Sequence, residues 1–285
     1  MSLSVFAFVM LAAFLHATWN AIVKGGSDKL LTTALVSSFS GLLALAALPF
    51  LPQPAAESWP YIGASVCCQV TYFSLIARAY HIGDMSQTYP LMRGAAPLLV
   101  ALVSFFVIGE YLAGFTWAGI AVISIGVLAL AYRPRARAGV LPLTGEGSAV
   151  GTALLNACVI AAYTLIDGHG VRQSDAPVAY ALWVFFLTSI PLAGWAIYTR
   201  KGLFFDYLRE NWSSGLIGGV GTSASYGLAL WAMTLAPVAV VAALRETSIL
   251  FGVAISAFVL RERVGKRRIM AAAIIAAGVI LLRLS

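Results

Sequence analysis

Two arginines and a glutamate in long apolar stretches are the residues of this chain best suited to chemistry. Arg93 lies between Pro90 and Pro97, and Arg245 is followed directly by Glu246. A charged side chain at the centre of a bilayer costs roughly 2.5 to 3.5 kcal/mol on insertion scales, so each arginine needs a partner or water. A guanidinium can hold a carboxylate through two parallel hydrogen bonds, and a buried glutamate can accept an ammonium group or a proton. These residue types favour the binding of a small charged metabolite.

A purely structural role fits the same three residues. An ion pair, or a bond to a backbone carbonyl freed by Pro90, satisfies an arginine as well as a substrate does. Both interpretations of Arg93, Arg245 and Glu246 therefore stay open at the level of the sequence.

Polar and aromatic residues recur along the other apolar stretches. His16, Trp19 and Asn20 are spaced so that they share one face of a helix. Tyrosine and tryptophan offer an apolar face and a hydrogen-bonding tip, so they suit either the wall of a cavity or the packed interior. The candidate substrate-binding residues are His16, Trp19, Asn20, Tyr72, Tyr89, Arg93, Tyr163, Tyr226, Trp231, Arg245 and Glu246. No catalytic residue, metal ligand or cofactor is predicted.

Charged residues near the ends of apolar stretches are assigned to structure. Asp167, His169 and Arg172 fit the solvated end of a helix. Glu110 and Glu262 fit the short links between helices. An intramembrane enzyme that uses His16, Asp167 or His169 is disfavoured, because no nucleophile, base and orienting group recur at a motif spacing.

The composition predicts a protein embedded in a membrane. Of the 285 residues, 61% are hydrophobic and 10% are charged, whereas soluble domains carry about 25% charged residues. The mean hydropathy is +0.91. Apolar segments long enough to cross a bilayer run near residues 3–23, 30–51, 59–80, 85–107, 113–132, 148–167, 177–199, 213–234, 237–259 and 265–284. We therefore expect an all-α integral membrane protein with ten transmembrane helices.

The two halves of the chain repeat each other. At an offset of 152 residues the matching pairs are Arg93 and Arg245, Ser104 and Ser256, Phe106 and Phe258, Val107 and Val259, Glu110 and Glu262, and Gly126 and Gly278. Five spans per repeat turn the second copy upside down, which is a recurrent plan in transporters. We predict a first five-helix repeat over residues 1–132, a linker over 133–147, and a second repeat over 148–285, folded around a central cavity.

The basic residues lie beside the predicted spans, and this explains the net charge of +7 without a nucleic-acid partner. The loops after the first, third, fifth, seventh and ninth spans carry fourteen basic residues, whereas the other loops carry only Arg172. The positive-inside rule then places both termini outside the cell. A cleaved signal peptide is not predicted, because the first apolar run ends in His16, Trp19 and Asn20 rather than in small residues.

The cysteines and the nucleotide-binding motifs limit the alternatives further. Cys67, Cys68 and Cys158 lie in apolar spans without a ligand spacing, so we expect buried small side chains rather than a metal or redox site. No G-x-x-x-x-G-K-[ST] motif occurs. Transport would then be driven by a substrate gradient or by protons, or be simple facilitation.

The repeated hairpins resemble a known family. The stretches VSFFVIGEYL and SAFVLRERVG each contain the repeated glutamate, and ISIGVLAL and IAAGVILL each contain the repeated glycine. Together with ten spans in an inverted five-plus-five repeat, they resemble the drug/metabolite transporter superfamily, in particular its EamA-type members such as aromatic amino acid exporters. The resemblance implies a basket-like arrangement with a central cavity that Arg93 faces. It also implies cytoplasmic termini, in contrast to the charge count.

We therefore expect a multi-pass secondary transporter of a plasma membrane, the bacterial inner membrane, that exports small amphipathic metabolites by alternating access. Amino acids, including aromatic ones, are the expected substrates, because a zwitterion needs a cation for its carboxylate and an acceptor for its ammonium group. The arginines, Glu246, Asn20 and the tyrosines supply both. Efflux of drugs or other metabolites is the alternative, and a scaffold or receptor is disfavoured. The expected partners are the substrate and the lipid bilayer, and the oligomeric state stays open, a monomer included.

Overall fold

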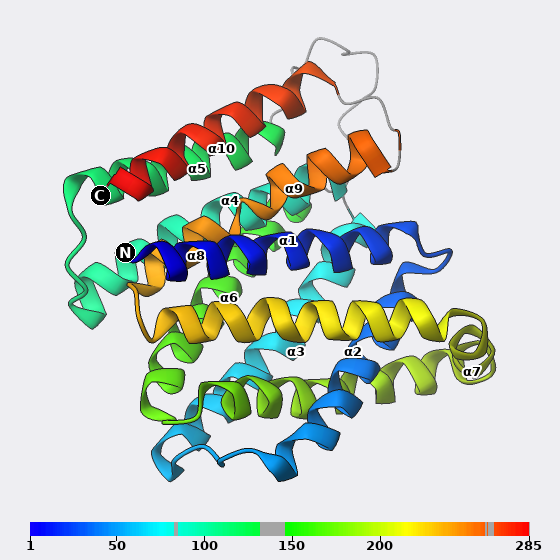
Figure 1. Ribbon diagram of the computed structural model, residues 1–285. Coiled ribbons are helices and arrows are strands. Elements are labelled where there is room, and N and C mark those ends of the chain that lie inside the picture. Colours follow the sequence, from blue (N-terminus) through cyan, green and yellow to red (C-terminus); the bar gives the residue numbers. More distant parts are fainter. Residues whose placement is uncertain (83–84, 132–145, 260, 262–264, 285) are drawn as a thin grey trace. The chain divides into compact units, whose positions relative to one another are not determined.

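The computed structural model describes residues 1–82, 85–131, 146–259, 261 and 265–284, and the regular elements in this part of the chain are helices (Figure 1). Most of the predicted linker, residues 133–145, lies outside the described residues. The helices are α1 (Leu3–Gly25), α2 (Lys29–Ala47), α3 (Trp59–Ile82), α4 (Met85–Val103), α5 (Gly114–Ala131), α6 (Glu146–Gln173), α7 (Pro177–Met233), α8 (Val238–Arg245), α9 (Ser248–Ala254) and α10 (Lys266–Leu284).

Seven helical stretches in the described residues are long and apolar enough to cross a membrane. They are Leu3–Gly25, Lys29–Phe50, Gln87–Ile108, Gly114–Ala131, Ser148–Gln173, Pro177–Arg200 and Val238–Phe258. The other three predicted spans coincide with α3, the last part of α7 and α10, which are not among these seven stretches. The protein is thus an all-helical, multi-pass membrane protein in its described part.

The long element α7 contains two kinks. The backbone leaves the helical region at Arg200 (φ −141°, ψ 43°) and at Asn211 (φ −120°, ψ 16°). Figure 1 shows the chain reversing its direction across this stretch. The kinks coincide with the ends of KGLFFDYLREN, the mixed apolar and charged stretch whose composition suits a short helix in the membrane interface.

The chain packs into two compact units, each made of segments that are distant in the sequence. The first unit contains residues Met1–Val70 and Ile166–Ala236, and the second contains Thr71–Leu165 and Pro237–Ser285. The boundaries fall inside α3 and α6, so each of these helices contributes to both units. These two units are defined by packing, and their residues differ from those of the two repeats predicted from the sequence. The division of the chain into two repeats stays a prediction.

The interior of the first unit joins α2 to α7. Leu31 and Leu35 of α2 pack with Phe204 and Tyr207 of α7. The hydroxyl groups of Thr32 and Tyr207 lie 2.7 Å apart in this interior. The short helical piece between the kinks of α7 therefore packs against α2.

The second unit contains a reciprocal contact between α5 and α10. A Cβ atom added to Gly126 would lie 2.8 Å from Cγ1 of Ile275, and one added to Gly278 would lie 2.6 Å from Cγ1 of Ile123. At the offset of 152 residues, Gly126 corresponds to Gly278 and Ile123 to Ile275. Each helix thus presents its glycine to the isoleucine of the other.

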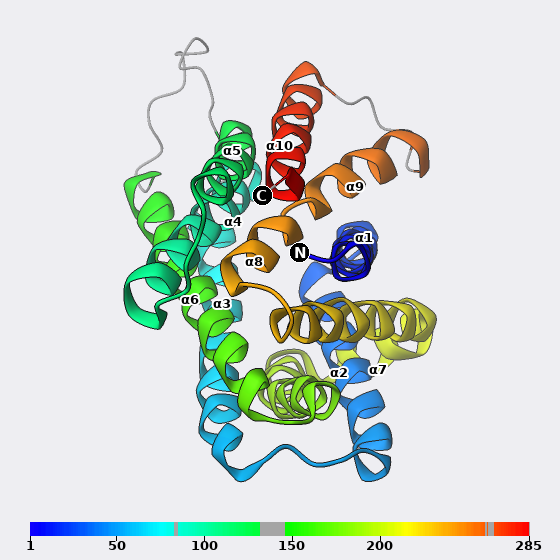
Figure 2. The same ribbon diagram turned by 60° about the vertical axis from the view of Figure 1, so that its left-hand side comes forward.

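The same two helices run in opposite directions. Gly119, near the start of α5, meets Leu282 near the end of α10, and Gly126 further along α5 meets the earlier Ile275. Figures 1 and 2 show the two helices side by side. The glycines allow the backbones to approach closely, as small residues do in membrane helix pairs.

Two π-helical turns occur at matching positions of the sequence repeat. The turn η3 (Ser104–Ile108) follows α4, and η5 (Ile255–Val259) follows α9. Such turns are rare and occur mostly as single bulges inside α-helices. The matched residues Ser104 and Ser256 both lie within these turns.

The prediction that the cysteines are buried is wrong for two of them. Cys67 on α3 and Cys158 on α6 are exposed, and Cys68 is partly buried. An apolar composition places a side chain in a membrane span, but it does not distinguish a surface covered by protein from one covered by lipid. The sequence therefore carries no signal for which way these thiols point.

Candidate functional site

A buried ion pair joins Arg93 of α4 to Glu246, the residue that follows α8. Nε of Arg93 donates a hydrogen bond of 3.1 Å to Oε2 of Glu246. Nη2 of Arg93 lies 2.9 Å from Oε1 of the same carboxylate, and the two side chains are only 6% and 5% exposed. A guanidinium that meets both carboxylate oxygens has the strongest ion-pair geometry available to side chains. The charges of Arg93 and Glu246 therefore neutralise each other inside the second unit.

The glutamate lies at a break between two helices. Glu246 and Thr247 form a turn between α8 and α9, where the ninth apolar segment was predicted to be one continuous helix. The amides of Glu246 and Thr247 bond the carbonyls three residues earlier, at 3.0 Å each. This tighter spacing is that of a 3₁₀ turn, which inside a helix often marks a hinge or strain. Figure 2 shows the change of direction between α8 and α9.

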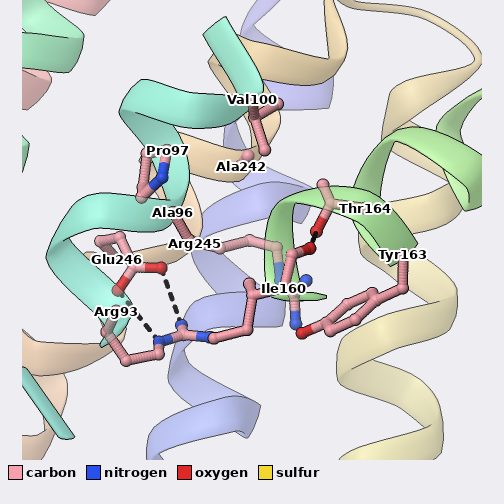
Figure 3. A pocket seen from close by; sticks show the side chains of 10 residues that line it. All are labelled: Arg93, Ala96, Pro97, Val100, Ile160, Tyr163, Thr164, Ala242, Arg245 and Glu246. Carbon is pink, nitrogen blue, oxygen red and sulfur yellow. Dashed lines mark hydrogen bonds and ion pairs between the residues drawn. The ribbon is translucent and has the colours of Figure 1, made fainter. Parts of the chain in front are cut away.

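The ion pair lines a small hollow inside the second unit. The hollow is lined by Arg93, Ala96, Pro97, Val100, Ile160, Tyr163, Thr164, Ala242, Arg245 and Glu246 (Figure 3). In Figure 3 the ring of Tyr163 points toward the arginine side chains. The space inside holds about one water molecule. The hollow is therefore too small, in this conformation, for any metabolite.

Two of the remaining predicted residues lie close to this set. The ring of Tyr72 on α3 contacts the ring of Tyr163, with their centroids 6.0 Å apart. Tyr89 lies one turn before Arg93 on α4 and is partly buried. Six of the eleven candidate residues therefore belong to the second unit: Tyr72, Tyr89, Arg93, Tyr163, Arg245 and Glu246.

A second acidic residue positions α8. The backbone N–H of Val238, the first residue of α8, lies 3.3 Å and 3.1 Å from the two carboxylate oxygens of Glu110. An anion at a helix N-terminus stabilises it, because the first N–H groups have no partner within the helix. This agrees with the structural role predicted for Glu110, whereas its sequence counterpart Glu262 lies outside the described residues.

The other five candidate residues belong to the first unit. On α1 the rings of His16 and Trp19 meet edge to face at 5.2 Å, and the amide of Asn20 donates to the carbonyl of His16 at 2.8 Å. On α7 the ring of Trp231 meets Phe8 at 5.2 Å. Tyr226, also on α7, is buried. These residues form local contacts within their unit rather than one cluster.

The sequence interpretation missed a buried acid in the first unit. Asp167 was assigned to a solvated helix end, but α6 continues to Gln173 and Asp167 is 0% exposed. Its carboxylate accepts hydrogen bonds from Ser65, Tyr180 and Tyr226. The signal available in the sequence was the stripe of polar residues along this helix, which ends at Asp167.

Arg172 was assigned to the same helix end, and it is exposed there, in the last turn of α6. Its Nε donates to the carbonyl of Met233 at 2.8 Å, and Nη2 donates to the carbonyl of Ala236 at 3.1 Å. Both carbonyls lie at the end of α7, where the last four C=O groups of a helix have no partner within it. Arg172 thus caps α7 from the end of α6.

Comparison with known proteins agrees with the resemblance stated from the sequence. Residues 147–284 match the EamA-like transporter family. This match agrees with the resemblance to the drug/metabolite transporter superfamily. No curated protein shows a significant sequence match.

The fold also occurs among solved structures. One similar structure, described only as the crystal structure of a protein, has a TM-score of 0.77 and 19% sequence identity. The similarity covers 98% of this chain and 95% of that chain. At this identity it shows a shared fold and nothing about substrate.

Proposed function

We propose that this chain, whose residues 147–284 match the EamA-like transporter family, is a secondary transporter that exports small amphipathic metabolites. Amino acids are the proposed substrates, and aromatic amino acids are the first to test. The proposed route is alternating access through a central cavity between two inverted five-helix repeats. The energy comes from the substrate gradient or from protons.

The observation that carries the proposal is the two-point ion pair between Arg93 and Glu246, with Arg245 lining the same hollow. Charged side chains at membrane depth are rare, and most of them face an interior where a substrate or ion is bound. A zwitterionic amino acid carries the same two charges as the pair. Its carboxylate can replace Glu246 on the guanidinium, and its ammonium group can replace Arg93 on the glutamate.

In this proposal Arg93 and Glu246 satisfy each other's charge while no substrate is bound. Separating two buried charges without replacement is costly, because each loses its partner in a medium that solvates ions poorly. An amino acid supplies both replacements at once, whereas a cation or an anion alone supplies only one. The pair therefore favours zwitterions over singly charged molecules of the same size.

The tight turn at Glu246 and Thr247 supports a change of conformation at this place. The hollow has no room for a metabolite in the present conformation, so the helices must move for a substrate to reach Arg93. Hinges in transporter helices are commonly at interruptions of this kind, where the backbone adjusts without loss of a whole helix. We place the hinge between α8 and α9.

The antiparallel contact of α5 with α10 supports the inverted repeat. Gly126 meets Ile275, and its sequence counterpart Gly278 meets Ile123, the counterpart of Ile275. Two matched helices that meet reciprocally and run in opposite directions are related by a two-fold axis perpendicular to them. A duplicated unit inserted with opposite orientation has this symmetry.

The experiment that tests the proposal is substrate flux in proteoliposomes that contain the purified full chain. Labelled phenylalanine, leucine and glutamate are compared with a cationic dye, and protein-free liposomes are the control. We expect saturable flux of phenylalanine above the control, and competition by unlabelled amino acids. Flux of the dye alone would replace this proposal by drug efflux, and no flux of any compound would contradict transport of both classes.

A further inference from the structure

The first unit contains a second buried charged site that the proposed function does not use. Asp167 on α6 is 0% exposed. Ser65 of α3 donates to its Oδ2 at 2.9 Å, and Tyr180 of α7 donates to its Oδ1 at 2.9 Å. Tyr226, much later in α7, donates a short hydrogen bond to Oδ2. Three side chains from α3 and α7 therefore converge on the carboxyl group of α6.

The three donors share a property that an arginine or lysine lacks. A hydroxyl group can donate a hydrogen bond or accept one, and it changes role by rotating about a single bond. While Asp167 is ionised, it accepts from Ser65, Tyr180 and Tyr226. When Asp167 is protonated, it becomes a donor, and one of the three hydroxyl groups can turn to accept from it.

The cluster therefore satisfies the hydrogen bonds of both protonation states without movement of the backbone. A buried polar group left without a partner costs about 1 to 3 kcal/mol, and this cost is avoided in either state. A carboxylate held by a fixed cation has no such freedom, since loss of its charge leaves the cation uncompensated. We propose that the carboxyl group of Asp167 is a proton-binding site, which takes up and releases a proton in the folded protein.

Titratable side chains connect this site to the end of α6. A Cβ atom added to Gly170 would lie 2.5 Å from the hydroxyl oxygen of Tyr180 and 2.5 Å from Cβ of Tyr61. Because glycine has no side chain, both tyrosines can pack close to α6 at this position. The ring of Tyr61 contacts the half-buried ring of His169 at 5.2 Å. Nε2 of His169 lies 2.8 Å from the amide of the exposed Gln173. His169 therefore lies between the ring of Tyr61 and the exposed Gln173, and it is the proposed entry point.

Two thiols on α3 are further ionisable groups in the described part of the first unit. Cys67 and Cys68 follow Ser65 on α3, and Cys68 interacts electrostatically with Asp167. Among the described residues, the groups named for the proton route are Asp167, Tyr180, Tyr226, Tyr61, His169, Cys67 and Cys68.

The test is pH-difference infrared spectroscopy of the full chain in lipid, which needs no substrate and does not depend on the proposed function. Protonation of a buried carboxyl group produces a carbonyl stretching band that carboxylates lack. We expect a band that titrates with pH in the wild type and in Glu57→Gln, which alters an exposed carboxyl group, and that is lost in Asp167→Asn. Identical difference spectra of the wild type and Asp167→Asn would overturn the proposal.

Two further variants keep the test decisive if Asp167→Asn does not fold. Ser65→Ala and Tyr180→Phe each remove one hydrogen bond and leave the carboxyl group in place, so each should shift the frequency of the band. The matched control is Tyr207→Phe, which removes the hydroxyl of a buried tyrosine that bonds Thr32 in the same unit, and it should leave the band unchanged. An unshifted band in both test variants, or a band that responds to sodium at constant pH, would contradict proton binding at Asp167.

Discussion

Arg93 and Glu246 lie 153 residues apart in the sequence and meet through both carboxylate oxygens in the interior of the second unit. One residue comes from α4 and the other from the turn after α8, so the pair joins the two sequence repeats. Neither residue is stable in this place without the other. Stability and transport must therefore be measured separately when the pair is altered.

The first prediction concerns the stability of this pair. Glu246→Gln leaves a buried guanidinium without its counter-charge and should destabilise the folded protein by about 3 to 5 kcal/mol. The double variant Arg93→Met with Glu246→Leu removes both charges and should recover most of this loss. Thermal unfolding in detergent measures both effects.

The control for this prediction is the exposed pair of Arg200 with Asp28, whose atoms lie 2.8 Å apart with Arg200 45% exposed. Solvent screens such pairs, so Arg200→Gln should change the stability by no more than about 1 kcal/mol. An equal loss in Glu246→Gln and Arg200→Gln would show that burial of the Arg93 pair has no energetic effect.

The second prediction concerns the contact of α5 with α10. Gly126→Ala and Gly278→Ala each place a methyl group within 2.8 Å or less of an isoleucine carbon, and overpacking of this kind costs about 1 to 3 kcal/mol. The two losses should be similar, because the contacts are reciprocal. Melting temperatures of the two variants test this symmetry.

A matched glycine on a neighbouring element provides the control. Nothing lies within 4 Å of a Cβ atom added to Gly252 on α9, and alanine is a better helix former than glycine by about 1 kcal/mol. Gly252→Ala should therefore leave the melting temperature unchanged or raise it. A loss in Gly252→Ala as large as in Gly126→Ala would contradict the packing argument.

The third prediction concerns the start of α8. Glu110→Ala removes both oxygens that face the N–H of Val238, and loss of a helix cap costs about 0.5 to 2 kcal/mol. Glu110→Gln keeps one oxygen acceptor and should cost less. Unfolding by heat ranks the two variants, with Glu57→Ala as the exposed control, which should change stability by less than about 0.5 kcal/mol. A ranking in which glutamine costs more than alanine would contradict a capping role for Glu110.

The positions of the individual helices in the sequence were largely predictable, because apolar segments of membrane length are a strong signal of helices that span a membrane. The seven stretches that meet the criterion for a span all fall on predicted segments. The break at Glu246 was not predictable, since Arg245, Glu246 and Thr247 are ordinary helix residues and contain neither glycine nor proline. Its cause lies in tertiary contacts, which the local sequence does not record.

The residue types of the candidate site were predictable from the sequence. The ion pair that these residues form was not. Buried charges stand out against an apolar background, so Arg93, Arg245 and Glu246 were found from the sequence. That Arg93 meets Glu246 depends on how α4 packs beside α8. Asp167 was missed for a simpler reason, because the predicted span ended at this residue whereas α6 continues by more than one turn.

The fourth prediction concerns orientation, where the positive-inside rule and the family resemblance disagree. The charge asymmetry places both termini outside the cell. A cysteine added before Met1, in a variant that lacks Cys67, Cys68 and Cys158, should then react with a membrane-impermeant thiol reagent in intact cells. Labelling only after the cells are broken would place the N-terminus in the cytoplasm.

The most direct measurement of the central claim is phenylalanine flux through proteoliposomes that contain the Arg93→Met, Glu246→Leu double variant. We expect this variant to fold, as the first prediction states, while it removes both charges of the pair, and Arg200→Gln is reconstituted as the control. We predict that Arg200→Gln carries phenylalanine at the wild-type rate, and that the double variant loses about tenfold or more, which corresponds to at least about 1.4 kcal/mol. Flux at the wild-type rate through a folded double variant would contradict the binding of substrate at the Arg93 and Glu246 pair.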